Sequence, residues 1–322
     1  MRPPLVGIGT FNHLKDAAAV GEAVRLAIAA GYRHLDFAPV HENQKECGLA
    51  ITAALAAPGA DVTREQLYVV SKLWCSDAAP EDVADACRKT LAELGLDYLD
   101  NYTMHWPVQM TKDSGIQYLN ICIAETYAAM EALVDAGLVR SLGVANFDVR
   151  MLGELMQDCR IAPITNQIEL HPFLSQSELT AFCATVDVHV VSYTPLGSMN
   201  VRGVDDPDLY GDSLVKRIAI ELGRTPGQVL QRWAVQRGAS VIDDALSPDH
   251  IVESRDVLDW AMSASQMERL DSLDIGHRFI QVTFFFFFFF FFTTSIWAPL
   301  AFSLFIFAQI VTLIYPYSLL HV

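Results

Sequence analysis

"LYVVSKLWCSDAAPEDVADACRKTLAELGLDYLDNYTMHW", residues 67–106, holds a short apolar run, a longer stretch with alanine and leucine at helical spacing, and a second short run. The helical stretch ends at Gly95, and glycine commonly follows the last turn of a helix. A strand, a helix and a second strand in this order form a βαβ unit with parallel strands. This segment therefore predicts a parallel sheet that is covered by helices.

The same alternation extends over most of the chain. Helical spacing also marks residues 16–31 and 124–137, each ending on glycine. Strict alternation of strand and helix is typical of α/β proteins, and eight such units in fewer than 280 residues predict a closed (β/α)8 barrel, the TIM barrel. The predicted strands are residues 33–38, 67–73, 99–106, 139–147, 164–170, 188–196, 239–245 and 255–261.

The C-terminal part of the chain has a different composition. After Arg278 there is no Asp, Glu, Lys or Arg, and residues 284–292 are nine consecutive phenylalanines. One interpretation is a membrane anchor within residues 284–320, although no Lys or Arg cluster follows to orient it. The other, which we favour, is translation of a pyrimidine-rich stretch that was never selected as protein. We therefore predict a barrel of residues 1–278, which folds by itself, and a hydrophobic C-terminal extension of residues 279–322.

Charge and cysteine content restrict the partners and the compartment. The chain has 22 basic and 38 acidic residues, a formal charge of −16, which would repel nucleic acid and leaves small molecules as the expected ligands. Its six cysteines form neither a CxxC pair nor a regular pattern, so neither a zinc site nor a disulfide framework is predicted. The N-terminus lacks the pattern of a secretory signal. A cytoplasmic protein is expected, with membrane association only if the apolar extension is a real anchor.

Polar residues occur where the predicted strands end. In a (β/α)8 barrel, catalytic groups gather at the C-terminal ends of the strands. Taken singly, each such residue has a structural explanation, for example an ion pair, a satisfied rim histidine or a turn former. Six of them at equivalent strand ends predict an active site. They are Asp36, Lys72, His105, Asn146, Gln167 and Tyr193.

Several short motifs carry a family resemblance. They are "GIGTF" (7–11), "GYRHLDFAPV" (31–40), "VVSKLW" (69–74), "MHWP" (104–107), "GLVRSLGVANF" (137–147), "NQIELHPF" (166–173) and "SYTPLGS" (192–198). In order and spacing, residues 5 to about 275 resemble the aldo-keto reductases. The resemblance implies the same barrel fold and the reduction of aldehydes or ketones to alcohols with NADPH. It also implies no Rossmann fingerprint, in agreement with the absence of a G-x-G-x-x-G motif.

The resemblance implies a catalytic group of an Asp, a Tyr, a Lys and a His, in which the tyrosine hydroxyl protonates the carbonyl oxygen. Asp36, Lys72 and His105 match three of these positions, but the fourth, five residues after the aspartate, is His41. An imidazole has an ordinary pKa of about 6.5, and a neighbouring Lys72 cation would lower it and keep the ring neutral. We therefore expect His41 to be a weak proton donor and reduction to be slow. The alternative is that His41 fills an unused pocket.

The resemblance also implies a cofactor site. Asn146 and Gln167 match the amides that hold the nicotinamide carboxamide, and Tyr193 matches the ring that stacks on the nicotinamide. Beside Asn146, Ala145 stands where the family commonly has serine. Ser198 matches the loop near the pyrophosphate, and Glu253 a residue near the adenine. The full implied set is Thr10, Asp36, Asn146, Gln167, Tyr193, Leu196, Ser198 and Glu253.

One part of the cofactor site departs from the family. In "VIDDALSPDHIVES" (241–254), Asp244, Ala245 and His250 stand where the family usually has a basic residue, a hydroxyl residue and an arginine that clamp the 2′-phosphate of NADPH. An aspartate repels a phosphate and accepts hydrogen bonds from a ribose diol instead. The resemblance implies NADP(H), and these substitutions make NAD(H) possible.

Three hypotheses follow. The first is a carbonyl reductase with weakened activity, an altered proton donor and a relaxed or reversed cofactor preference. The second is a non-catalytic barrel that binds a dinucleotide or a partner. The third is a metal-dependent hydrolase, suggested by His34, Asp36, His41 and His105, although no further ligand pattern accompanies them.

Overall fold

The computed structural model describes residues 2–11, 16–59, 61–112, 118–119, 122–198, 203 and 205–280. The chain divides into two compact units, residues 1–280 and 281–322. The phenylalanine run belongs to the second unit, so both interpretations of it concern residues outside the described ones.

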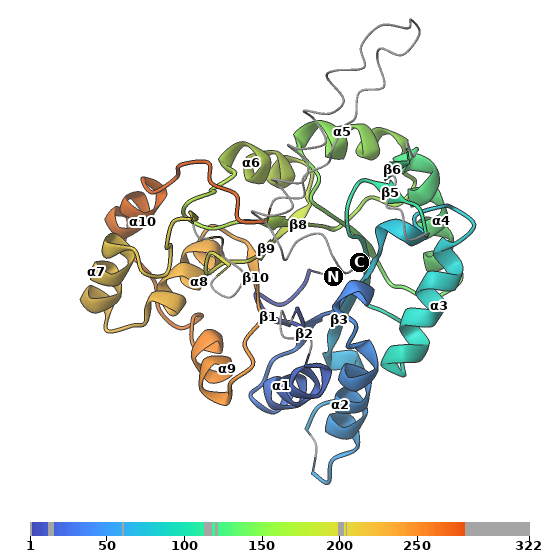
Figure 1. The fold of residues 1–322 in the computed structure, drawn as a ribbon, viewed down its shortest axis with the longest axis horizontal. Coiled ribbons are helices and arrows are strands. Elements are labelled where there is room, and N and C mark those ends of the chain that lie inside the picture. The colour runs from blue at the N-terminus through green and yellow to red at the C-terminus, as the bar shows by residue number, and fades with distance from the viewer. Residues whose placement is uncertain are drawn as a thin grey trace, which may run out of the picture. The chain divides into compact units, whose positions relative to one another are not determined.

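Eight parallel strands form a closed barrel, which confirms the predicted fold (Figure 1). Strands adjacent in the chain are mostly neighbours in the barrel, and the first strand closes it by pairing with the last. Around the barrel the order is β1 (Val6–Gly9), β2 (His34–Asp36), β3 (Tyr68–Leu73), β4 (Asn101–Met104), β7 (Leu142–Ala145), β8 (Thr165–Glu169), β9 (His189–Tyr193) and β10 (Ser240–Asp243). A short antiparallel pair, β5 (Gln109–Met110) and β6 (Tyr118–Leu119), lies outside the barrel sheet.

The helices surround the strands (Figure 1) and contribute buried apolar residues to the core. In α3, Val83, Cys87, Leu91 and Leu94 are buried at helical spacing, so one stripe of the helix faces the core. The helices are α1 (Ala17–Ala29), α2 (Gln44–Ala56), α3 (Val83–Leu94), α4 (Ile123–Asp135), α5 (Val149–Asp158), α6 (Ser177–Thr185), α7 (Ser213–Leu222), α8 (Pro226–Gln236), α9 (Pro248–Arg255) and α10 (Ala264–Asp271).

One predicted strand is wrong. Residues 255–261 form no strand: α9 ends at Arg255, and the following residues are turns and irregular backbone. The eighth strand is β1 at the N-terminus, whose Gly7 and Gly9 disfavour a strand by propensity. Side chains of neighbouring segments fill the space beside both glycines. A Cβ atom at Gly7 would lie 2.6 Å from Ile242 Cδ1, and one at Gly9 would lie 2.2 Å from Asp244 Oδ1.

Two further features bear on the sequence predictions. All six cysteines are free. In the parts of the chain that the structure describes, no helix combines the length and the apolar character needed to cross a bilayer.

Candidate functional site

A buried ion pair lies at the C-terminal ends of β2 and β3. The Lys72 ammonium donates to Asp36 Oδ1 and also to the backbone oxygen of Phe37, at 3.1 Å. Asp36 and Lys72 are 3% and 2% exposed, so neither charge is screened by much water. Gln167, in the middle of β8 and not at its end as expected, donates from Nε2 to the second carboxylate oxygen of Asp36 at 2.7 Å. The structure thus joins three of the predicted site residues in one hydrogen-bonded group.

His41 ends the short 3₁₀ turn Pro39–His41 that follows β2. Its Nδ1 atom lies 3.0 Å from the hydroxyl of Thr10, which also donates to the backbone oxygen of Asp36 at 3.1 Å. The ring meets Phe11 edge to face, with 5.7 Å between ring centroids. Burial and the nearby Lys72 cation lower the pKa of His41 to about 3, against a smaller opposing effect of Asp36. His41 is therefore neutral at physiological pH, as the sequence analysis expects.

His105 follows β4 and completes the group of four predicted catalytic residues. Burial, then Lys72 and then His41, hold the pKa of its imidazole well below the ordinary value. Its ring contacts Trp74 edge to face, at 5.0 Å between centroids. Nδ1 is buried and has no hydrogen-bond partner among the described residues. An unpaired acceptor is the less costly state for such an atom, which leaves the hydrogen on Nε2.

Tyr193 and Asn146, the last two of the six residues predicted at strand ends, are joined by a hydrogen bond. Tyr193, the last residue of β9, donates its hydroxyl hydrogen to Asn146 Oδ1 at 2.7 Å, and Asn146 Nδ2 donates to the backbone oxygen of His105 at 2.9 Å. Asn146 has φ 64°, a left-handed conformation that asparagine adopts more readily than most residues. Burial raises the pKa of the Tyr193 phenol, so Tyr193 stays neutral and can act as a hydrogen-bond donor.

The loop after β9 is held in an uncommon backbone conformation. Thr194 and Ser198 have φ 55° and 52°, and Gly197 between them has φ 79°. A β-branched residue such as Thr194 is rarely found there, and such residues cost about 1–3 kcal/mol and concentrate at functional sites. Leu196 and Ser198, the two loop residues predicted to approach the cofactor, are both half-buried.

Asp244 follows β10 and faces into the site. Its Oδ1 accepts from the backbone N–H of Phe11 at 3.3 Å. Burial, then Asp243 and Asp36, raise the pKa of Asp244 to about 7. Its carboxyl group therefore connects the end of β10 to the loop after β1, on the side where Thr10 and His41 lie.

The other residues of segment 241–255 offer no phosphate clamp. Ala245 is buried, and His250 is exposed on α9. Glu253 accepts a hydrogen bond from the Thr225 hydroxyl at the start of α8. Within residues 241–255, which the structure describes in full, Arg255 is the one Lys or Arg, and its guanidinium lies against Gly31.

The end of the described chain is bound to the same face of the barrel. Glu169, the last residue of β8, is fully buried and accepts from the backbone N–H groups of Phe279, at 2.6 Å, and Ile280, at 3.1 Å. His171 Nε2 lies 3.0 Å from the same carboxylate. The Phe279 ring contacts His171 at 5.0 Å between centroids. Residues 279 and 280 therefore belong to the barrel, two residues beyond the predicted boundary.

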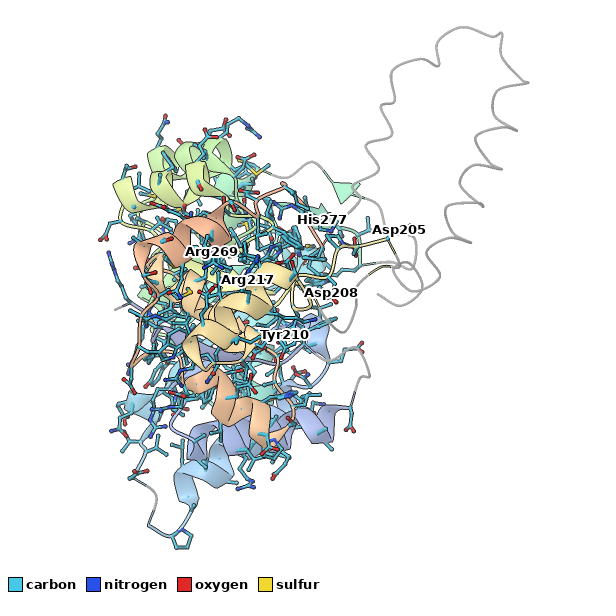
Figure 2. The ribbon with its side chains drawn as sticks, turned by 90° about the vertical axis from the view of Figure 1, so that its left-hand side faces the viewer. Asp205, Asp208, Tyr210, Arg217, Arg269 and His277 are labelled. Atoms are coloured by element: carbon cyan, nitrogen blue, oxygen red, sulfur yellow. The ribbon has the colours of Figure 1, made fainter. Side chains whose placement is uncertain are left out.

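His277 lies on the same side of the barrel as the acidic segment after β9. Figure 2 labels Asp205, Asp208 and Tyr210 of this segment together with His277. His277 Nε2 is 3.1 Å from Asp206 Oδ1.

We expect a chain that ends at Ile280 to be more stable than one that ends at Arg278, by about 3 kcal/mol or more. The shorter chain loses two hydrogen bonds to a buried carboxylate, and bonds to charged groups contribute about 1.5–3 kcal/mol each. Urea unfolding of the two truncated proteins at pH 7 measures the difference. Equal free energies of unfolding would contradict a stabilising role of the Glu169 contacts.

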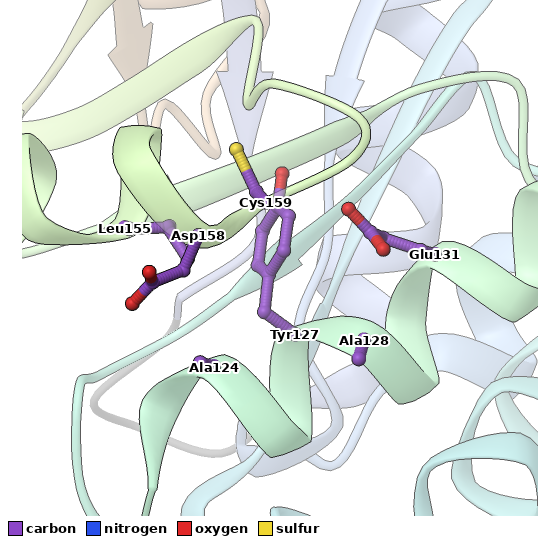
Figure 3. A pocket seen from close by; sticks show the side chains of 7 residues that line it. All are labelled: Ala124, Tyr127, Ala128, Glu131, Leu155, Asp158 and Cys159. Carbon is purple, nitrogen blue, oxygen red and sulfur yellow. The ribbon is translucent and has the colours of Figure 1, made fainter.

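A small pocket lies elsewhere, between α4 and α5 (Figure 3). Tyr127 points from α4 towards Cys159, and its hydroxyl has no partner among the described residues. Burial and the nearby Glu131 raise the pKa of the Cys159 thiol, so it is not a ready nucleophile. The lining consists of Ala124, Tyr127, Ala128, Glu131, Leu155, Asp158 and Cys159.

The residues suggested for a metal site have other contacts in the structure. His34 Nδ1 lies 3.1 Å from the backbone oxygen of Pro4, and its ring meets Tyr68 edge to face. Among the described residues, no group of three or more His, Cys, Asp or Glu side chains is placed to hold a metal ion.

Neither Phe11 nor the link between Thr10 and His41 was predicted from the sequence. Phe11 lies in the "GIGTF" motif and is 47% exposed, so an exposed aromatic residue next to a strand end was the available signal. The hydrogen bond between Thr10 and His41 left no signal, because it depends on side-chain directions in two separate loops.

Comparison with known proteins agrees with this architecture. The model of the "Aldo/keto reductase family" matches residues 5–275. The chain is 40% identical over 288 residues to "Aldo-keto reductase family 1 member A1" of Bos taurus and 39% identical to the protein of that name in Homo sapiens, in each case over 86% of this chain and 88% of the relative. It is 37% identical over 290 residues to the Danio rerio protein "Aldo-keto reductase family 1 member A1-A", over 87% and 89% of the two chains. With its closed barrel and its matching strand ends, the chain belongs to the aldo/keto reductase family.

Proposed function

We propose that this protein interconverts aldehydes or ketones and alcohols with a nicotinamide cofactor, and that it reduces carbonyl groups more slowly than an enzyme with tyrosine at position 41. The observation that carries the proposal is the buried Asp36–Lys72 pair at the strand ends, with His41 and His105 beside it. An ion pair that only stabilised the fold would not need the two histidines beside it. The six free cysteines fit the cytoplasmic location that we propose.

The residues have distinct roles in this proposal. The cofactor supplies or accepts a hydride at the substrate carbon. Asn146, Gln167 and Tyr193 would hold its nicotinamide, through two amides and an aromatic ring. The neutral His105 can donate from Nε2 to the substrate oxygen, and Lys72 provides positive charge near that oxygen. Asp36 holds Lys72 in place, and Trp74 packs against His105.

A second candidate function follows from His41 itself. A neutral imidazole is a very weak acid, and such a group suits a barrel that binds a dinucleotide but no longer turns over a carbonyl substrate. The two functions differ in one measurement, because the binding protein shows dinucleotide affinity and no oxidation or reduction of any carbonyl or alcohol. A panel of reactive aldehydes and the corresponding alcohols, assayed at pH 5 to 9, separates them.

For the cofactor, we expect NADPH to bind no better than NADH. Asp244 carries negative charge above its pKa of about 7 and stands where a cation would be needed, and Ala245 offers no donor. Fluorescence titration of both dinucleotides at pH 8 tests this, and a preference for NADPH above about tenfold, or about 1.4 kcal/mol, would contradict it.

The same titration with Asp244→Lys should shift the preference towards NADPH by at least about tenfold. Asp85→Lys makes the same change of charge on the outer surface of α3, where the side chain is 88% exposed, and serves as the control. If both variants shift the preference equally, net charge rather than position 244 sets the choice of cofactor.

A further inference from the structure

The hydrogen bonds of Thr10 determine which nitrogen of His41 carries hydrogen. The Thr10 hydroxyl lies 3.1 Å from the backbone oxygen of Asp36 and 3.0 Å from His41 Nδ1. A hydroxyl has one hydrogen, and a backbone carbonyl can only accept. If Thr10 donates to Asp36, then Nδ1 must donate its own hydrogen to Thr10, and two hydrogen bonds form. If Thr10 donates to Nδ1, one bond forms and the carbonyl contact is lost.

The two-bond arrangement leaves Nε2 of the neutral ring without hydrogen. A neutral imidazole carries one N–H, and its position follows from the partner of each nitrogen. No hydrogen bond to Nε2 is made within the described part of the chain, and Nε2 is not one of its buried unpaired atoms. Nε2 is therefore a bare acceptor that solvent or a substrate can reach.

We propose that Thr10 is a positioning residue that holds His41 in the Nδ1–H tautomer, so that Nε2 accepts the hydroxyl proton of an alcohol substrate. The proposal rests on the proposed function, in which the chain uses a nicotinamide cofactor. The site at neutral pH is then arranged for alcohol oxidation, whereas a tyrosine hydroxyl at position 41 would be arranged to give a proton.

The step balances as follows. The alcohol C–H bond breaks and its electron pair leaves as hydride to the oxidised nicotinamide, which is reduced. The O–H bond breaks, its electrons form the second carbon–oxygen bond, and the proton goes to His41 Nε2. The alcohol becomes a carbonyl compound, and His41 becomes an imidazolium that still donates from Nδ1 to Thr10. The imidazolium then releases its proton to water at the partly exposed site.

The groups that face His41 keep its ring neutral and therefore ready to accept the alcohol proton. Lys72 on β3 disfavours a second positive charge on the ring, and Asp36 on β2 opposes it only in part. His105 after β4 is neutral, Phe11 after β1 contributes an aromatic edge, and Asp244 after β10 lies near Asp36. The imidazolium is thus short-lived, and the resting form is the proton acceptor.

The first test reads the tautomer without cofactor or substrate. In ¹⁵N-labelled protein, correlations between ring hydrogens and ring nitrogens distinguish Nδ1–H from Nε2–H, and the signals of His41 are identified by their loss in His41→Phe. We expect the Nδ1–H pattern in the parent and in Thr10→Ser, which keeps the hydroxyl, and its loss in Thr10→Val. An Nε2–H pattern in the parent, or no change in Thr10→Val, would overturn the proposal.

The second test uses rates. Reduction requires the protonated ring, so between pH 5 and 7, above the His41 pKa of about 3, it should fall about tenfold per pH unit, while oxidation stays constant. Thr10→Val should slow both directions by the same factor, about tenfold or more, because both pass through one transition state, and Thr10→Ser should restore the rate. Reduction that is independent of pH over this range would overturn the role of Nε2.

The two tests separate this proposal from the proposed function. If no dinucleotide binds and neither direction proceeds, the proposed function fails. The tautomer pattern then still decides whether Thr10 positions His41, because it is measured on the protein alone.

Discussion

Replacing His41 with tyrosine should raise the turnover of a reactive aromatic aldehyde at pH 7 by at least about tenfold, or about 1.4 kcal/mol in transition-state stabilisation. Asp36 and Lys72 already form their buried pair, and His105 stands beside it. A phenol of ordinary pKa about 10 would be brought towards neutrality by the Lys72 ammonium. The parent ring has a pKa of about 3, so its protonated form is scarce at pH 7.

His41→Phe is the matched control for this gain. Phenylalanine has the ring of tyrosine without the hydroxyl, so it keeps an aromatic ring against Phe11 but offers no proton. Steady-state reduction rates of the three proteins, with cofactor binding measured in parallel, give the result. If His41→Tyr binds cofactor and is no faster than His41→Phe, the barrel has lost more than its proton donor, and the binding function becomes the better account.

Replacing Lys72 with methionine should lower the free energy of unfolding by about 3–5 kcal/mol. Removing the cation leaves the Asp36 carboxylate buried, with the Gln167 amide as its remaining side-chain partner in the described structure. Removing one partner of a buried ion pair is costly because the other charge keeps its desolvation penalty. Urea unfolding at pH 7, followed by circular dichroism, measures the change.

Arg88→Met provides the comparison for Lys72→Met. Arg88 pairs with Asp85 on the surface of α3, with the two side chains 60% and 88% exposed. Exposed pairs contribute about 0–1 kcal/mol, so this variant should unfold almost like the parent. Equal losses for Lys72→Met and Arg88→Met would mean that the pair at the strand ends is hydrated and not buried.

Most strands were predictable because an apolar run in the sequence coincides with a buried strand in the structure. Residues 67–73 read as an apolar run, and β3 spans Tyr68–Leu73 with every residue buried. The same kind of pattern failed at residues 255–261, where Val257 is buried in irregular backbone and mimics a strand residue. β1 was missed because glycine is depleted in strands, and strand propensity does not register that neighbouring side chains fill the space beside Gly7 and Gly9.

In the candidate site, contacts between neighbouring strand ends were predictable and contacts between loops were not. Asp36 and Lys72 stand at the ends of neighbouring strands, so their pairing follows from the barrel. The bond between Thr10 and His41 joins residues 31 positions apart, and the bonds from Glu169 reach 110 and 111 positions along the chain. Such contacts depend on the path of loops, which residue types and their spacing do not encode.

The binding of Phe279 and Ile280 by Glu169 affects how the protein should be handled in the laboratory. It brings residue 280 to the mouth of the barrel, next to the loop after β9, since a Cβ at Gly197 would lie 3.2 Å from the Phe279 ring. Arg2 pairs instead with Asp187, two residues before β9 begins, at the opposite end of the strands. A purification tag or reporter fused after residue 280 would start beside the substrate entrance, whereas one fused ahead of residue 2 would start at the far end and leave the entrance open.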